Sequence, residues 1–271
     1  YTGGDVRLED ILNISVEGNR VSGTDANIDV ACYEGLKVTN NHVDGYIRTY
    51  APNSATTPRL SSFNQKPEIQ SNNCNYIDLQ RATGASVKDN TTVDFNVGSN
   101  SNTANIINNV ITGLDSPLDT ARVRLFDGNE VTVVGDIAFN NSSIDFSFPF
   151  QFTGNTITGN SYTSNYFISA SFNADDPDYG RFSNNYIECT SCNRPVELEG
   201  TYCSMTGNTI LGSASSDNAI DIHGDQMVVT GNVLRYGDIK LRNDTANIVT
   251  SNKCSSVINT GFTTNIVANN G

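Results

Sequence analysis

The chain has 271 residues, a formal net charge of −13 and 37 asparagines. A chain this acidic is poor in the Lys and Arg that bind nucleic-acid phosphates, and no run of about 18 apolar residues could cross a membrane, so we expect neither nucleic-acid binding nor membrane insertion. Ile, Val, Leu and Phe recur at regular intervals, which excludes a disordered tail and indicates a folded core.

A six-residue motif recurs along the whole sequence. It reads apolar, any residue, Gly/Asn/Ser/Asp, Asn, any residue, apolar or small, as in VEGNRV, FTGNTI and VTGNVL. Gly and Asn tolerate the left-handed backbone, so each copy predicts a bend at its Asn. Successive copies are on average about 23 residues apart, which indicates a structural repeat. The fourth-position asparagines are Asn19, Asn41, Asn72, Asn90, Asn109, Asn129, Asn155, Asn185, Asn208, Asn232 and Asn252.

Each repeat unit is built from short segments in which apolar and polar residues alternate. This period of two is typical of strands, and the leucine framework of leucine-rich repeats is missing. Three short strands and three bends per unit fit the pattern, with each strand stacked in parallel on the next coil. The motif asparagines would then form a hydrogen-bonded ladder. Cys74 and Cys254 occupy an inward slot that is apolar elsewhere, so we expect buried thiols there.

From about Val6 to Asn252, this pattern resembles the right-handed parallel β-helix proteins of the pectin-lyase-like superfamily. That superfamily includes pectate lyases, polygalacturonases and phage tailspikes, and tailspike or depolymerase β-helices are the most similar. The resemblance implies an all-β, single-stranded right-handed β-helix of about eleven coils, with an Asn ladder. We expect residues 1–271 to form a single β-helix domain of a longer protein. No charged-then-apolar leader opens the sequence.

A second motif, apolar-polar-apolar, lies before most ladder asparagines. Because a strand alternates its faces, the middle residue is expected to point outward. The stacked carboxylates would repel one another unless protonation, cations, a metal or solvent offsets their charge. For Asp29, Asp78 and Asp94 we expect a solvated polar face. The first predicted column is Asp29, Asp78, Asp94, Asp119, Asp145, Glu197, Asp221 and Lys240, and the second is Ala31, Gln80, Asn96, Ser147, Glu199, His223 and Arg242.

Near the end of the two columns the residues are no longer only aspartates and amides. There we predict a two-by-two cluster on adjacent coils, made of Glu197, Glu199, Asp221 and His223. Hydrolysis of a glycosidic bond needs two carboxyls, one of them protonated. A lyase or epimerase would instead need a base and a cation near a uronate, roles open to His223 and to Lys240 or Arg242. The predicted catalytic residues are Glu197, Glu199, Asp221 and His223, and the predicted substrate-binding residues are Lys240, Arg242, Asp145, Tyr179 and Tyr50.

Two intervals exceed the repeat length and predict extruded loops at residues 48–68 and 171–181. Loops on a rigid scaffold commonly carry recognition residues, and aromatic side chains there could stack on sugar rings. Three aspartates in the second loop could hold Ca²⁺, although a solvated turn is the alternative. The aromatic residues are Tyr50, Phe63, Phe172 and Tyr179, and the aspartates are Asp175, Asp176 and Asp178.

Cysteines cluster at Cys189, Cys192 and Cys203. Three thiols without a neighbouring histidine do not complete a typical zinc site, so no metal is predicted. A Cys192–Cys203 disulfide is possible if the protein is extracellular.

These observations predict a carbohydrate-binding or polysaccharide-degrading β-helix of tailspike type, acting as a glycoside hydrolase or polysaccharide lyase. The expected partner is a polysaccharide or cell-surface glycan, the expected assembly a homotrimer or larger, and the expected location extracellular or on a virion surface. No cofactor is expected apart from the Ca²⁺ considered above. The alternative is a non-enzymatic virion or cell-surface rod that binds a receptor or spaces other domains.

Overall fold

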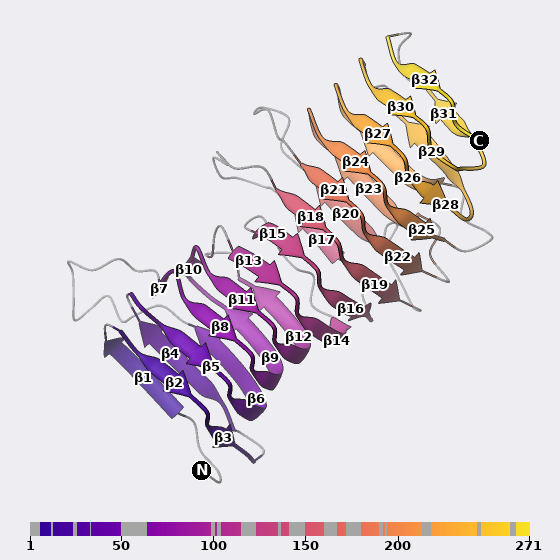
Figure 1. Ribbon diagram of the computed structural model, residues 1–271. Coiled ribbons are helices and arrows are strands. Elements are labelled where there is room, and N and C mark those ends of the chain that lie inside the picture. The colour runs from indigo at the N-terminus through magenta and orange to yellow at the C-terminus, as the bar shows by residue number, and fades with distance from the viewer. Residues whose placement is uncertain are drawn as a thin grey trace. The chain divides into compact units, whose positions relative to one another are not determined.

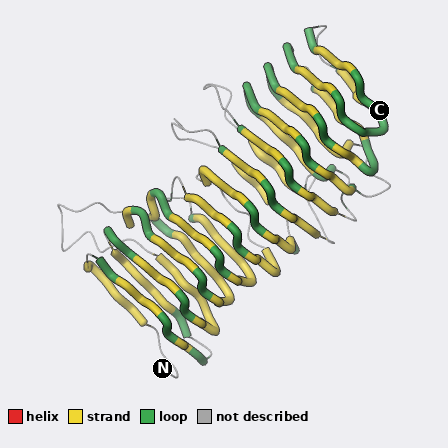
Figure 2. Tube along the Cα trace, viewed as in Figure 1, coloured by secondary structure: helices red, strands yellow, loops and turns green. Residues whose placement is uncertain are grey.

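The computed structural model shows a chain built of parallel strands that coil and stack (Figure 1). It contains two compact units, residues 1–130 and 131–271, which are considered separately. No helix occurs among the described residues (Figure 2), and none of these residues forms an apolar helix of membrane-spanning length. The structure describes residues 6–11, 13–23, 26–32, 34–49, 64–98, 101, 104–114, 123–134, 137–140, 150–159, 167–171, 180–189, 192, 194–212, 218–242, 245–260 and 264–271.

The first unit contains two long parallel sheets and a two-stranded one. One sheet has the order β1 (Val6–Ile11), β4 (Ile28–Cys32), β6 (His42–Thr49), β9 (Asn73–Leu79), β12 (Thr91–Val97) and β14 (Val110–Leu114), and β3 (Arg20–Val21) also pairs with β6. The other has the order β2 (Ser15–Glu17), β5 (Lys37–Thr39), β8 (Glu68–Gln70), β11 (Ser86–Lys88), β13 (Ala104–Ile107) and β15 (Val123–Asp127). The short sheet pairs β7 (Asn64–Gln65) with β10 (Ala82–Thr83).

The second unit has three parallel sheets. The first is β16 (Glu130–Val133), β19 (Thr156–Gly159), β22 (Tyr186–Cys189), β25 (Thr209–Leu211) and β28 (Val233–Leu234). The second is β18 (Gln151–Thr153), β21 (Arg181–Ser183), β24 (Ser204–Thr206), β27 (Val228–Thr230), β30 (Ile248–Thr250) and β32 (Ile266–Ala268). The third is β17 (Ile137–Asn140), β20 (Ile168–Ser171), β23 (Val196–Glu199), β26 (Asn218–His223), β29 (Asp238–Leu241) and β31 (Val257–Asn259).

Inward side chains stack on their counterparts in the next turn and form the core of each unit. In β2, β5 and β8 only the middle residue is buried, and these residues, Val16, Val38 and Ile69, pair in register. Burial of one such side chain contributes about 1.5–3 kcal/mol. Cys74 is buried as predicted, and burial raises the pKa of its thiol to about 12. The same prediction is wrong for Cys254, which is partly exposed.

The predicted Asn ladder is confirmed in each unit. Asn41 donates from its backbone N and from Nδ2 to Asn72 Oδ1, both at 3.0 Å, and its Nδ2 also donates to Val16 O. Its own Oδ1 accepts two hydrogen bonds from Asn19. Asn41 is 2% exposed, so these bonds satisfy a buried amide. The ladder includes Asn19, Asn41, Asn72, Asn90, Asn109 and Asn129 in the first unit and Asn155, Asn185, Asn208, Asn232, Asn252 and Asn270 in the second.

The left-handed residue at each corner is not the ladder asparagine, as the sequence suggested, but the residue before it. Gly18, Asn40 and Ser71 have φ of 66°, 57° and 56°. The third motif position is thus restricted to residue types that tolerate this backbone. The fourth position needs Asn for a different reason, which is its hydrogen bonds along the stack.

The number of turns is lower than predicted. The described residues form about eight turns rather than about eleven. A single domain over residues 1–271 stays a prediction.

Candidate functional site

The predicted cluster lies on three neighbouring strands of the second unit, β23, β26 and β29. Glu197 pairs in register with Asp221 and Glu199 with His223, which confirms the predicted two-by-two arrangement. On the other side of β26, Lys240 pairs with Asp221, and Arg242 follows the end of β29. Parallel pairing without a shift at these positions therefore brings together six ionisable residues from three turns.

Asp221 is the buried centre of this cluster. Its side chain is fully buried, although we expected an outward, accessible carboxylate. Arg242 binds both carboxylate oxygens, with Nε 2.8 Å from Oδ1 and the NH2 group on Oδ2. Burial alone would raise the pKa of Asp221, but His223 and Arg242 outweigh it and lower that pKa. Asp221 is therefore ionised and inaccessible, and no substrate can contact it directly.

His223 lies between two carboxylates. Its Nε2 is 3.5 Å from Asp221 Oδ1 and 3.6 Å from Glu197 Oε1. Neither approach has hydrogen-bond geometry, and Nε2 is buried without a hydrogen-bond partner. The adjacent Asp221 carboxylate raises the pKa of His223, against the opposite effect of burial. The imidazole ring is consequently favoured in its protonated form while its side chain stays 29% exposed.

Glu197 is held from the opposite side by a residue that the sequence analysis did not select. Ser169 on β20 pairs in register with Glu197, and its Oγ donates to Glu197 Oε2 at 2.8 Å. Oε1 is left facing His223. The signal was present in the sequence, because Ile168-Ser169-Ala170 is another apolar-polar-apolar triplet.

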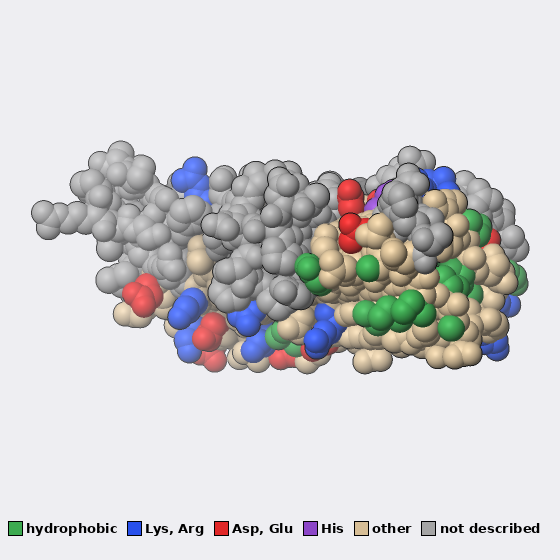
Figure 3. Space-filling view, turned by 90° about the horizontal axis from the view of Figure 1, so that it is seen from above, with side chains coloured by type: hydrophobic (Ala, Val, Ile, Leu, Met, Phe, Trp, Pro, Cys, Tyr) green, Lys and Arg blue, Asp and Glu red, His purple; other side chains and the backbone are tan. Residues whose placement is uncertain are grey.

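The remaining predicted site residues differ in how far the structure describes them. Glu199 is exposed and Lys240 half-buried, both on the same sheet as Asp221. Asp145, Tyr179 and Tyr50 lie outside the described residues, as do Phe63, Phe172, the three aspartates of the second loop, Asp119 and Ser147. Figure 3 shows a histidine side chain beside acidic ones on the face in view. Among the described residues no group of His, Cys, Asp and Glu has the arrangement of a metal site.

The first unit contains a related polar column with a different register from the one predicted. Asp29 pairs with Arg48, Arg48 with Asp78 and Asp78 with Asn96. Arg48 binds both oxygens of Asp29, at 2.9 and 3.2 Å, so an interleaved cation offsets the carboxylates. Asp29 and Asp78 are 5% and 7% exposed, which contradicts the expected solvated face.

Asp94 is not part of this column. It pairs with Tyr76, while Asn96 takes the place beside Asp78. Val93, which should have faced the core, is 46% exposed. The strand turns a corner here, and two consecutive side chains, Val93 and Asp94, point away from the core, which interrupts the period of two on which the prediction relied.

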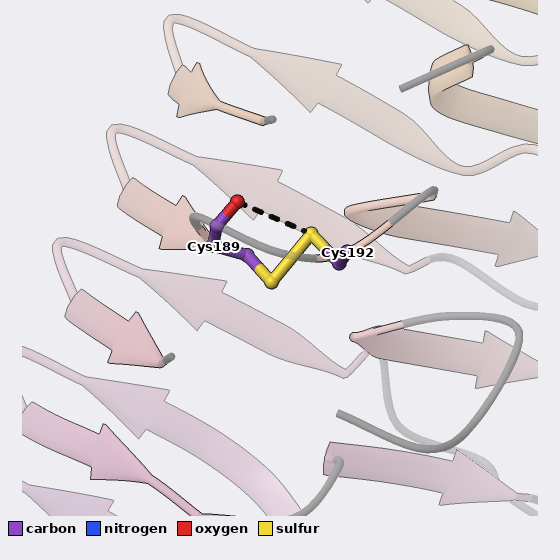
Figure 4. The surroundings of a disulfide bond; sticks show 2 residues. All are labelled: Cys189 and Cys192. Atoms are coloured by element: carbon purple, nitrogen blue, oxygen red, sulfur yellow. Dashed lines mark hydrogen bonds between the residues drawn. A yellow bond between two sulfur atoms is a disulfide. The ribbon is translucent and has the colours of Figure 1, made fainter. Parts of the chain in front are cut away.

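A disulfide lies in the corner that leads from β22 to β23 (Figure 4). It joins Cys189 and Cys192, both buried. The pairing of Cys192 with Cys203 suggested by the sequence is therefore wrong. Phe167 N and Ile168 N bond to Arg194 O and Pro195 O in the same corner, so the segment that precedes Glu197 is tied to β20.

Comparisons with protein-family models, curated proteins and solved structures gave no match for this chain. The parallel β-helix is shown by strand pairing and by the Asn ladder, and it is consistent with a β-helix superfamily. Likeness to pectin-lyase-like or tailspike proteins in particular stays a prediction, and any function has to be argued from the site itself.

Proposed function

We propose that this β-helix binds a polysaccharide across β20, β23, β26 and β29 and cleaves it with Glu197 and His223 as the reacting groups. The observation that carries the proposal is the buried Nε2 of His223, which has no hydrogen bond and lies 3.6 Å from Glu197 Oε1. A buried polar atom without a partner is costly in a purely structural network, and such atoms are often functional.

The distance between the two groups favours elimination over hydrolysis. Glycoside hydrolases place their two carboxyls about 5–5.5 or 6.5–9.5 Å apart, on either side of the scissile bond. Glu197 and His223 are too close to flank a bond, and Asp221 is fully buried, so the pair Glu197 and Asp221 does not fit either. Neighbouring base and acid groups can instead act on one face of a sugar ring.

In the proposed reaction the polymer contains uronic acid residues. The Glu197 carboxylate takes the carbon-bound proton beside the uronate carboxylate, the bond from the adjacent ring carbon to the glycosidic oxygen breaks, and the partly exposed imidazolium ring of His223 gives a proton to that oxygen. A carbon–carbon double bond forms, so the products are an unsaturated end and a new hydroxyl. Lys240, in register with Asp221, would offset the charge of the substrate carboxylate.

A panel of bacterial surface and plant polysaccharides tests this function, with unsaturated and reducing ends measured after incubation. We expect both kinds of end from an acidic polymer with the wild-type protein, and their loss with E197Q. The matched control is E17Q, at an exposed position of β2 in the first unit, which should cleave normally. Reducing ends without unsaturation would indicate hydrolysis, and equal cleavage by wild type and E197Q would exclude Glu197.

A non-enzymatic rod is the second candidate, because the same ladder repeats in every described turn and makes each unit stiff. Binding of a polysaccharide without new ends would favour it. For either function we propose an extracellular or virion-surface location, which the Cys189–Cys192 disulfide supports. We also propose a homotrimer or larger assembly, which sedimentation at several protein concentrations would test.

A further inference from the structure

We infer that Asp221 is a positioning residue that, clamped by Arg242, keeps His223 protonated and directed at Glu197, so that His223 is the proton donor of the site. The catalytic meaning of this inference rests on the proposed function. The protonation state that it assigns does not, because it follows from the contacts within the cluster and can be measured without a substrate.

The clamp fixes Asp221 in place. Arg242 Nε and the Arg242 NH2 group take one carboxylate oxygen each, and the side chain of Asp221 has no exposed surface. A bidentate pair of this kind restricts both partners and favours the ionised carboxylate. The Oδ1 atom that accepts from Arg242 Nε is also the one that faces His223, so the negative charge lies 3.5 Å from Nε2.

The charged groups around His223 come from three strands. Glu197 lies 3.6 Å away on β23, and Glu199 on the same strand is the register partner of His223. Lys240 is on β29 and Arg242 follows it, and the charge of Arg242 opposes protonation of the imidazole. The adjacent Asp221 carboxylate has the largest effect, and together with Glu197 it outweighs burial and the charge of Arg242, so the pKa of His223 is raised.

The clamp also explains the absence of a hydrogen bond at Nε2. Asp221 is held by Arg242 and Glu197 by Ser169, so neither carboxylate is oriented to accept the Nε2 proton with good geometry. The Nε2 atom itself is buried between these two carboxylates, while the side chain of His223 stays 29% exposed. Asp221 acts on the reaction only through His223.

The test is an NMR titration of the imidazole groups, which is direct because the chain contains only 2 histidines. His42, on β6 of the first unit, is the internal control, and its Nε2 lies 3.4 Å from Asp44. In the wild type we expect His223 to titrate above the usual imidazole range of about 6.5. In D221N the pKa of His223 should fall, with the His42 signal as the reference in each spectrum. D221E, which keeps the charge, should restore most of the difference.

Two further results separate this inference from the alternatives. E197Q should lower the pKa of His223 less than D221N does, because Glu197 has the weaker effect on the ring. If D221N does not fold, the titrations of the wild type and of E197Q still show whether the pKa of His223 is raised. A His223 pKa at or below the usual range, or one that does not respond to Asp221, would overturn the inference.

Activity gives an independent readout if the protein cleaves a polymer. The alkaline limb of the kcat/KM profile should move to lower pH in D221N, since His223 then loses its proton earlier. A merely structural role for Asp221 would lower activity at every pH without moving that limb. Absence of cleavage with every polymer would refute the proposed function and leave the titration result standing.

Discussion

Each of the two units contains a buried aspartate whose two carboxylate oxygens are bound by one arginine, here called the clamp. In the first unit Arg48 binds both oxygens of buried Asp29, and in the second Arg242 binds both oxygens of buried Asp221. Beyond the clamp they diverge. The amides of Gln80 and Asn96 donate to the two oxygens of Asp78, whereas His223 Nε2 is the one buried side-chain nitrogen or oxygen atom that lacks a hydrogen bond among the described residues.

This difference teaches which polar column is structural. Amide donors and carboxylate acceptors satisfy one another in the first unit, so that column stabilises its turns. The second unit places histidine and glutamate at equivalent outward positions, and we propose that these are the reacting groups. A buried aspartate bound by arginine is thus common to both units, and the two aspartates differ in the residues that surround them.

The largest expected effect concerns the feature that the units share. N90A in the first unit and N208A in the second each leave two buried donors of the preceding ladder asparagine without an acceptor. Because each unsatisfied donor costs about 1–3 kcal/mol, we expect a loss of about 4 kcal/mol in both variants. Denaturant unfolding measures it. A clearly smaller loss in one variant would show that the ladder is not an equal support in both units.

Removing the buried aspartate of either arginine–aspartate pair should lower the free energy of unfolding, by a larger amount in the second unit than in the first. D221A leaves Arg242 without its carboxylate and should lower the free energy of unfolding by about 3 kcal/mol, the low end for breaking a buried pair. D29A should cost less, because Arg48 is 37% exposed and can be hydrated, against 29% for Arg242. The same unfolding experiment measures both variants. An equal or larger loss in D29A would contradict this ranking.

The disulfide should contribute less than the clamp. C192S opens the loop of the second unit that Cys189 and Cys192 close, and a loop this short gives about 2 kcal/mol in the chain-entropy model. Unfolding with and without a reductant checks this, with C203S as the control because the disulfide does not include Cys203. A wild-type stability insensitive to reductant would show that the bond is not formed in solution.

The smallest effect is the dependence of stability on pH. The folded-state pKa of His223 is raised, so its contribution is full below the unfolded value of about 6.5 and is lost as the pH rises through the folded pKa. H223Q should remove this decline between neutral and alkaline pH, and unfolding at several pH values measures it. A decline of the same size in H223Q would assign it to another group.

The two units should also differ in the pH at which their buried aspartates take up a proton. Burial raises the pKa of Asp78 despite the amides of Asn96 and Gln80, whereas the pKa of Asp221 is lowered. As the pH falls, Asp78 should therefore take up its proton before Asp221, and carboxyl-carbon NMR can follow both. The reverse order would contradict the contrast between a carboxylate held by amides and one held by cations.

Much of the fold could be predicted because the ladder position demands one residue type. All eleven asparagines selected from the sequence are ladder members, and the register of Glu197 with Asp221 followed from counting back from them. Arg48 was missed because its triplet ends in Thr49, a polar residue that is nevertheless buried and bonds to Gln80 O.

The chemical state of the candidate site could not be predicted in the same way. Alternation indicates that Asp221 points away from the core, but not that Arg242 then covers it and leaves it fully buried. The disulfide partner of Cys192 could not be predicted either, because it depends on the backbone path through the corner between β22 and β23. Contacts between turns, rather than spacing within a turn, decide these features.

The most direct test of the central claim, that the cluster on β23, β26 and β29 binds a polysaccharide, is to titrate the protein with oligosaccharides and follow its two imidazole signals by NMR. The account predicts that the His223 signal shifts in a saturable manner while the His42 signal of the first unit stays in place. Movement of His42 alone, or of neither signal with any acidic oligosaccharide, would contradict it.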